Sequence, residues 1–455
     1  MNFENLEQVE VLSAITIRKR LEVLNTNTTP DEVGRLIKDI SALLVSRNTV
    51  VGNFPDMLFL ISDIADLLAP LEDCGYIKFN AEAAVNKDGY IPIIFINSPV
   101  EQHLVKEIVR RGNTKDLPAL IDVHTPIVHA HIDTTALIEP KAGLRTLIDN
   151  NENFLHSRLH GRGVIDMKSQ IAVIIMSLYI LKSLDKKPPL VILTSDEEMS
   201  CVYSKDILNY IYPHKGVFDL EPCKPDALSN EIRPSSRLNF FLGAKRSSKY
   251  ELIKDRKISY EKSLEDLQCS ILYLAQTYYP KPLFDVHITA EVGKFSISII
   301  DIEGYNSILS INKEFETQVK MLIENCFEVI TSSFSPYPSL QSELSPRLKN
   351  AMSQILPRRK VVEITLQNKL TTTDYERDII GRASISHNFN TASSLTWGEY
   401  GVDDIGNIGP REDGEGRHSE DEVLFLHDDV ILYHNLVEFL TIDEVGNSEQ
   451  YFIEA

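Results

Sequence analysis

The stretch that decides the fold runs from residue 166 to residue 198 and reads "DMKSQIAVIIMSLYILKSLDKKPPLVILTSDEE". Its first part, Met167–Leu184, has apolar residues on successive helical turns and few charges, which predicts a buried helix. Its second part, "PPLVILTS", is a short apolar run bounded by prolines and acids, which predicts a buried strand. The strand ends in Asp196, Glu197 and Glu198, whose like charges repel one another unless solvent or a cation lies opposite.

A second strand is predicted upstream of this helix, in "TPIVHAHIDTT" at residues 125–135. Strand, helix and strand with short connections form a βαβ unit, so a parallel sheet is expected. Residues 1–85 form a mostly helical N-terminal region by the spacing of their apolar residues. The helices and the one further strand predicted in this half of the chain lie near Glu7–Leu24, Pro30–Ser46, Met57–Leu68 and Tyr90–Pro99.

The pattern changes after Arg246 and predicts an inserted α+β domain at residues 244–345. Residues 248–279 have a helical period, residues 283–305 alternate like strands of an antiparallel sheet, and residues 312–333 predict a further helix. A larger α/β domain would then comprise residues 1–243 and 346–455. The strand and the closing helix predicted in its second segment are "VVEITLQ" at 361–367 and "DVILYHNLVEFLTI" at 429–442.

The overall composition excludes several classes of protein. A chain of 455 residues is too long for one simple core, so two domains are expected. Its net charge of -20 argues against binding to nucleic acids or to anionic membranes. The five cysteines show no CxxC spacing, which fits a reducing compartment. With no signal peptide and no apolar run of about 20 residues, we expect a soluble cytoplasmic protein.

Four polar clusters lie where α/β enzymes build their sites, at the ends of strands or helices. The first is "HAHID", in which His131 and Asp133 share one face of an extended chain. A metal-bound imidazole needs an acceptor for its other ring N–H, which a nearby carboxylate provides. Taken alone, however, this pattern is weak, because a buried histidine is usually a core residue. His129 lies on the same face and could compete with His131 for the role.

The other three clusters are also ambiguous when they are taken singly. "HGRGVIDMKSQIA" places Asp166 at a helix start, where it could simply be an N-cap. The acidic triplet alone would be a solvated loop, and His418, in "NIGPREDGEGRHSEDEVLF", would be a surface histidine. Together, the clusters supply the imidazoles and carboxylates of a dinuclear zinc site. Two cations about 3.5–4 Å apart can polarise a carbonyl and lower the pKa of a shared water.

The order HxD, GRGxxDMK, DEE and GPxxxxxGxHSxDE, from His131 to Glu422, resembles the dizinc peptidase and deacylase family. This family contains acetylornithine deacetylase, succinyl-diaminopimelate desuccinylase, aminoacylase and glutamate carboxypeptidase. The resemblance implies an α/β catalytic domain with a central mixed, mainly parallel sheet flanked by helices. The insert falls where the family carries its smaller α+β lid and dimerisation domain.

The resemblance also implies roles for individual residues. The implied metal ligands are His131, Asp166, Glu198, Glu231 and His418, with Glu197 as the catalytic general base and Asp133 orienting His131. Asp166 would bridge the two metals. For the fifth ligand, Glu221 keeps the family's Glu-Pro dipeptide, whereas Glu231 keeps the surrounding frame and its spacing to the insert, which favours Glu231.

The sequence departs from the family pattern at several points. Ser169 stands where the DMK motif is usually followed by glycine, and the early part of the insert has no histidine. His287 is the one histidine of the insert and comes too late for a clean match, so we interpret it as a plain strand residue. Arg347 and Arg411 are only guesses for the arginine that would bind a substrate carboxylate.

The function predicted from these motifs is hydrolysis of an amide bond in a small peptide or an N-acyl amino acid. It would use a water activated by two divalent ions, most simply zinc, with cobalt or manganese as alternatives. A homodimer through the insert is implied by the resemblance alone. Two alternatives stay open at this stage: a metal-binding relative that serves as a binding protein with little catalysis, and another dimetal hydrolase such as a phosphoesterase.

Overall fold

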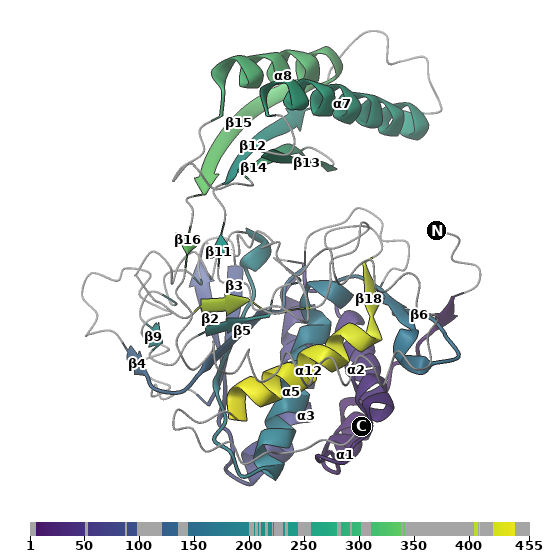
Figure 1. Ribbon diagram of the computed structural model, residues 1–455, viewed down its shortest axis with the longest axis vertical. Coiled ribbons are helices and arrows are strands. Elements are labelled where there is room, and N and C mark those ends of the chain that lie inside the picture. The colour runs from purple at the N-terminus through teal and green to yellow at the C-terminus, as the bar shows by residue number, and fades with distance from the viewer. Residues whose placement is uncertain are drawn as a thin grey trace. The chain divides into compact units, whose positions relative to one another are not determined.

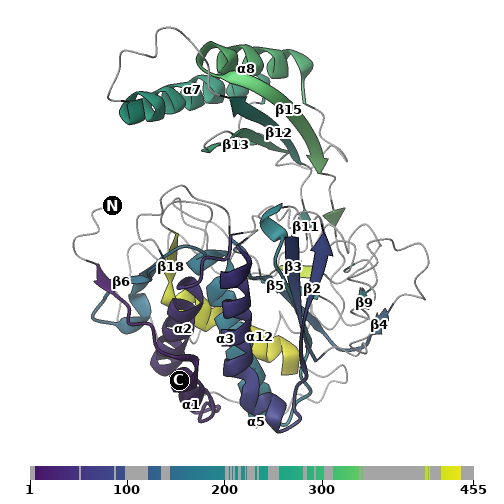
Figure 2. The same ribbon diagram turned by 180° about the vertical axis from the view of Figure 1, so that it is seen from behind.

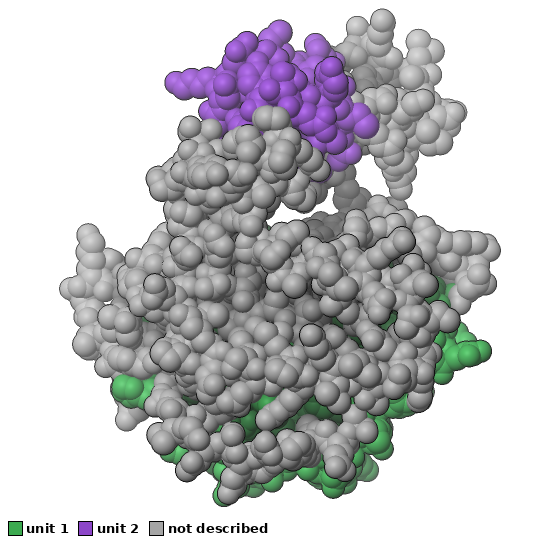
Figure 3. All heavy atoms as spheres, in the orientation of Figure 1, with its two compact units in different colours: residues 1–230, 342–455 green, residues 231–341 purple. Residues whose placement is uncertain are grey.

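The computed structural model divides the chain into two compact units, residues 1–230 with 342–455 and residues 231–341 (Figure 3). The structure describes residues 6–50, 53–86, 89–97, 121–134, 144–199, 204, 208, 211–213, 217–220, 222, 231–232, 235–243, 256–279, 284–291, 294–301, 311–337, 340–341, 405–407, 409 and 422–441. The strand predicted at 361–367 lies outside these residues.

The larger unit begins with a short strand and three helices. They are β1 (Glu7–Gln8), α1 (Ala14–Leu21), α2 (Pro30–Val45) and α3 (Phe54–Asp73). The start of α2 is fixed by a capping box, in which Thr29 and Glu32 each accept from the other's backbone N–H, and by Pro30 in the first turn. Helix α1 is shorter than the predicted Glu7–Leu24, because Ser13 caps it and β1 pairs with β6 (Leu147–Asp149) instead.

A mixed, mainly parallel sheet forms the centre of this unit, as the sequence predicted (Figures 1 and 2). In spatial order its strands are β17 (Ile405–Asn407), β10 (Val217–Asp219), β5 (Ile127–His131), β8 (Leu190–Thr194), β3 (Gly89–Ile96) and β2 (Phe79–Asn86). The first four are parallel to one another, whereas β3 and β2 are antiparallel additions at one edge. Strands β5 and β8 are the two strands of the predicted βαβ unit.

The crossover helix of that unit is α5 (Ser169–Ser183), and its residues from Ser169 to Leu181 are all buried. It packs against α2 and against the closing helix α12 (Leu426–Thr441), as Figure 1 shows. The segment Val164–Ser183 is long and apolar enough to cross a membrane, but its apolar stretch is buried within the protein. A helix that is apolar on all sides and covered on all sides is a core helix.

A second, smaller sheet has the order β1-β6-β7-β18. Strand β7 (Arg158–His160) runs into the turn that carries Asp166, and β18 (Val423–Phe425) runs directly into α12. The two strands are antiparallel neighbours, with His160 opposite Val423. This pairing brings the C-terminal segment of the chain beside the Asp166 turn, although the two are far apart in sequence. A further short pair joins β4 (Ile121–Val123) and β9 (Ile211–Pro213).

The smaller unit, residues 231–341, is an α+β fold. Its antiparallel sheet has the order β13 (Phe284–Glu291), β14 (Lys294–Asp301), β12 (Ser235–Gly243) and β15 (Glu328–Tyr337), and its helices are α7 (Arg256–Tyr278) and α8 (Lys313–Cys326). One apolar core joins side chains of both helices and the sheet. The short strands β11 (Glu231–Ile232) and β16 (Leu340–Gln341) pair at its two ends.

Two features of this unit differ from the sequence-based expectation. The helix predicted at 312–333 ends at Cys326, and the β-branched run that follows forms β15, because a neighbouring strand is present for it to pair with. The insert was predicted to begin at residue 244, but β12 lies between β14 and β15 in the small sheet. The compact unit therefore includes residues from Glu231 onward.

Candidate metal centre

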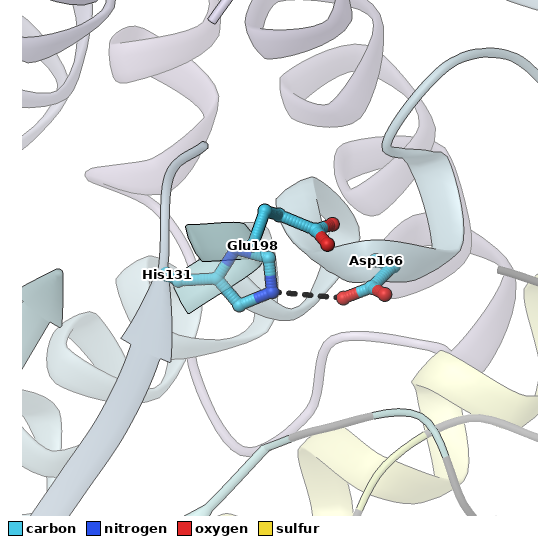
Figure 4. Close-up of side chains that lie close together, drawn as sticks. All are labelled: His131, Asp166 and Glu198. Atoms are coloured by element: carbon cyan, nitrogen blue, oxygen red, sulfur yellow. Dashed lines mark hydrogen bonds and ion pairs between the residues drawn. The ribbon is translucent and has the colours of Figure 1, made fainter. Parts of the chain in front are cut away.

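Three side chains converge just beyond the carboxyl ends of β5 and β8. One ligand atom from each of His131, Asp166 and Glu198 lies within 4.8 Å of the other two (Figure 4). They come from three different segments: the last residue of β5, the turn before α5 and the turn after β8. Imidazole nitrogen and carboxylate oxygen are suitable donors for a divalent transition metal, so the cluster fits a metal site.

Each ring nitrogen of His131 faces a carboxylate residue. Its Nδ1 lies 3.0 Å from the backbone oxygen of Asp133 and 3.3 Å from that residue's Oδ1. Its Nε2 lies 2.8 Å from Oδ1 of Asp166. Burial lowers the pKa of His131, but hydrogen bonds to Asp133 and Asp166 and their negative charges outweigh that effect and place the pKa well above its usual value. The side chain is therefore oriented with Nε2 toward the other two members of the cluster.

Asp166 is not the N-cap of α5, because that position belongs to Lys168. It lies in a π-helical turn at Val164–Lys168, where its own φ and ψ of −131° and 87° are not helical. The turn is entered through Gly163 at a φ of 70°, and a Cβ there would lie only 2.6 Å from Cγ2 of Thr134. Glycine is therefore required on both steric counts. The second glycine of the GRG pattern is therefore explained by the conformation of this turn.

The acidic triplet is divided between two tasks. Asp196 is fully buried and accepts hydrogen bonds from the backbone N–H and the hydroxyl of Ser204. Glu197 and Glu198 begin a 3-10 turn at Glu197–Met199. The two oxygens of the Asp133 carboxylate accept their backbone N–H groups, at 3.3 Å and 3.0 Å respectively. Asp133 therefore contacts both His131 and the Glu197–Glu198 turn. The sequence did not indicate its contact with the turn.

Glu197 has a raised pKa. Burial raises its pKa to about 7, and the charges of Glu198, Asp166 and Asp133 add to this effect while His131 opposes it. A carboxylate whose pKa lies near the working pH can both accept and return a proton. Glu198, its neighbour in sequence, is the one that joins the His131–Asp166 cluster.

Comparison with known proteins identifies the family. Residues 127–379, more than half of the chain, match the sequence model of peptidase family M20/M25/M40. The chain belongs to this family. No curated protein sequence matches it. The M20 membership supports a hydrolase, and the His131 cluster is its possible metal site.

Solved structures of M20-like fold cover nearly the whole chain at low identity. The di-peptidase Dug1p of Saccharomyces cerevisiae is 11% identical with a TM-score of 0.51, covering 94% of this chain and 98% of its own. Human carnosine dipeptidase 1 is 10% identical with a TM-score of 0.51, covering 95% and 99%. At this level of identity, the likeness shows a common fold.

The structure excludes one rival for the metal role. His129, on the same face of β5, is fully buried, with Nδ1 at 3.0 Å from Oδ1 of Asp219 and Nε2 at 3.3 Å from Oγ1 of Thr194. Both partners belong to neighbouring strands of the sheet, so His129 is a core histidine.

The remaining predicted site residues lie outside the described residues or are described by their backbone alone. His418, Glu221, Arg347 and Arg411 lie outside the described residues. The backbone of Glu231 is in β11, opposite Gln341, and that of His287 is in β13, opposite Ser298, but their side chains are not described.

Two buried charged residues, one at the end of the Asp166 turn and one beside it, were not assigned a role from the sequence. Glu422 is 2% exposed, and burial and the Asp166 charge raise its pKa to about 7 against the opposing effect of Arg162. Lys168 is 1% exposed and donates from Nζ to the backbone oxygen of Arg47 at 2.7 Å, and burial lowers its pKa to about 7. The available signal was that each belongs to a quoted motif, DMK and HSxDE.

Proposed function

We propose that this member of the M20 family is a metal-dependent amidohydrolase that cleaves an amide bond in a small peptide or an N-acyl amino acid. The observation that carries the proposal is the convergence of His131, Asp166 and Glu198 at the carboxyl edge of the central sheet. Sites of α/β proteins are built at this edge, and three ligands from three segments do not meet there by sequence proximity.

The three residues of the cluster fit a divalent ion, and the family pattern extends this to two ions. Zinc is the first candidate, with cobalt or manganese as alternatives. His131, Asp166 and Glu198 would hold them, and the family pattern adds His418 and Glu231. When bound, the ions would polarise the scissile carbonyl and lower the pKa of a water molecule.

The protein's own groups then divide the remaining work. Asp133 keeps the ring of His131 in place through Nδ1 and holds the Glu197–Glu198 turn through its carboxylate. Glu197 is the general base: it accepts a proton from the attacking water and returns it to the leaving amine nitrogen.

The proposal extends to the setting of the enzyme. We propose a small-molecule substrate and a cytoplasmic location, with no nucleic-acid or membrane partner, in line with the net charge of -20. A homodimer through residues 231–341 is proposed from the family resemblance alone.

The deciding experiment is a substrate panel on protein loaded with zinc, cobalt or manganese. Dipeptides come first, because the two solved structures of the same fold are dipeptidases, followed by N-acyl amino acids and one phosphate ester. We expect hydrolysis of a dipeptide or an acyl amino acid by the metal-loaded protein alone. Metal binding without turnover of any amide would instead favour a binding protein, and turnover of the ester alone would favour a phosphoesterase.

A further inference from the structure

The Asp166 turn is held from the far end of the sequence. The backbone N–H of Gly161, just after β7, donates to the backbone oxygen of Glu422, just before β18, at 3.2 Å. The β7–β18 pairing continues this contact at His160 and Val423. The backbone of Glu422 is therefore held beside the turn, which places its side chain within reach of the turn.

The Glu422 side chain then binds the turn itself. Its Oε2 accepts the backbone N–H groups of Ile165 and Asp166, each at 3.2 Å. Because Asp166 and Met167 depart from helical dihedral angles, this turn does not supply the regular pattern of helical acceptors. Buried N–H groups need an acceptor, and one carboxylate oxygen here serves two of them.

A similar arrangement holds the turn that carries Glu198. There the Asp133 carboxylate accepts the consecutive N–H groups of Glu197 and Glu198. Each of the two acid-bearing turns is thus held by another buried acid that accepts two consecutive backbone N–H groups. Burying a carboxylate is unfavourable unless its oxygens are well satisfied, so two such acids around one cluster indicate a shared purpose.

We propose that Glu422 is a positioning residue that fixes the carboxylate of Asp166 for metal binding by accepting the N–H groups of Ile165 and Asp166. The inference rests on the proposed metal centre. Glu422 would not contact the metal or the substrate. Its contribution is the direction of the Asp166 side chain, which must stay aimed at Nε2 of His131 and at Glu198.

Two substitutions separate the reach of this side chain from its charge. Glu422→Gln keeps an acceptor oxygen at the same distance from the backbone and removes the charge. Glu422→Asp keeps the charge and shortens the side chain by one methylene, so that one oxygen cannot reach both N–H groups. The matched control is Asp429→Asn, which alters another fully buried acid, in the first turn of α12.

The readouts are the affinity for Co²⁺, measured against a competing chelator, and the visible absorption spectrum of the cobalt-loaded full-length protein. We expect Glu422→Asp to weaken cobalt binding about 10- to 100-fold, as removal of an outer contact to a metal ligand does, and to shift the spectrum. Glu422→Gln should retain most of the affinity and the wild-type spectrum, and Asp429→Asn should leave both unchanged.

Three results would overturn the inference. Equal cobalt affinity and spectra in the wild type and Glu422→Asp would show that the contact does not position Asp166. A greater loss in Glu422→Gln than in Glu422→Asp would assign the effect to charge. If the Asp variant does not fold, a large loss of cobalt affinity in Glu422→Gln relative to the wild type would assign the effect to charge as well, because Gln is nearly isosteric with Glu. Absence of cobalt binding by the wild type would remove the proposed metal centre as well, which distinguishes the two failures.

Discussion

His129 and His131 stand two residues apart on the same strand and point to the same face, yet they have different chemical environments. His129 lies within the sheet, where Asp219 of β10 and Thr194 of β8 engage its two ring nitrogens. His131 lies at the end of the strand, where its Nε2 faces Asp166 from a turn. His129 is thus paired with residues of the neighbouring strands, whereas His131 contacts residues of the adjacent turns. The edge of a sheet is therefore where a ligand-binding histidine can form.

The largest expected effect concerns the acidic turn at that edge. Glu197→Gln should lower kcat for the preferred amide substrate by roughly 10²- to 10⁴-fold, because the proton acceptor is removed. Bound metal, measured by elemental analysis, should stay at the wild-type level, since Glu198 is the member of the cluster and is untouched. An unaltered rate in this variant would contradict the role of Glu197.

The two histidines can be compared directly by the same substitution. His131→Leu should abolish tight metal binding, because it removes one donor of the three-residue cluster. His129→Leu should leave the metal content unchanged but lower the free energy of unfolding by about 1–3 kcal/mol, because Asp219 loses its buried partner. Metal titration and urea denaturation would measure the two effects. Loss of metal in both variants would contradict the assignment of His131 to the metal site and of His129 to the core.

The turn that carries Asp166 should tolerate less change than an ordinary turn. Gly163→Ala should destabilise the protein by about 1–3 kcal/mol, because it combines a positive φ with a close contact to Thr134. Gly75→Ala is the matched control: its φ of 73° is similar, but nothing lies within 4 Å of the added Cβ, so only the cost of a left-handed conformation, about 1 kcal/mol, is expected. The difference in stability loss between the two variants, measured by thermal unfolding, gives the cost of the contact with Thr134. Equal losses of stability would argue against a cost from that contact.

The last expected effect depends on pH and concerns Asp429, a buried acid in the first turn of α12. Burial raises the pKa of Asp429 to about 8 from its ordinary value of 3.8, with the nearby polar side chain of Ser169 opposing and the charge of Asp428 reinforcing the shift. The folded state then retains a proton that the unfolded state releases, so wild-type stability falls as the pH rises through this interval.

Asp429→Asn removes this pH dependence. The variant should match the wild type near pH 4 and exceed its free energy of unfolding by on the order of 1–3 kcal/mol at pH 8. Denaturant melts at several pH values would measure the difference. A constant difference across this range would show that Asp429 does not titrate as its burial indicates.

Much of the fold followed from local pattern. The apolar helix, the two strands around it and the polar residues at their ends are all visible in residues 125–198, because helical and strand periods are written into neighbouring residues. The run after Cys326 was predicted wrongly as helix, because its partner strand β12 lies about 90 residues away in sequence. Strand pairing of this kind leaves no local signal.

The sequence by itself determined which residue types are available for the site and the order in which they occur: His131, Asp166, the acidic triplet and the HSxDE segment. Only the tertiary structure decided how they are used. In the structure, His129 is paired with Asp219 within the sheet, Asp196 accepts a hydrogen bond from Ser204, and Glu422 accepts one from the Asp166 turn. The physical reason is that a buried polar group must find a partner, and that partner is set by strand order and by contacts between distant segments.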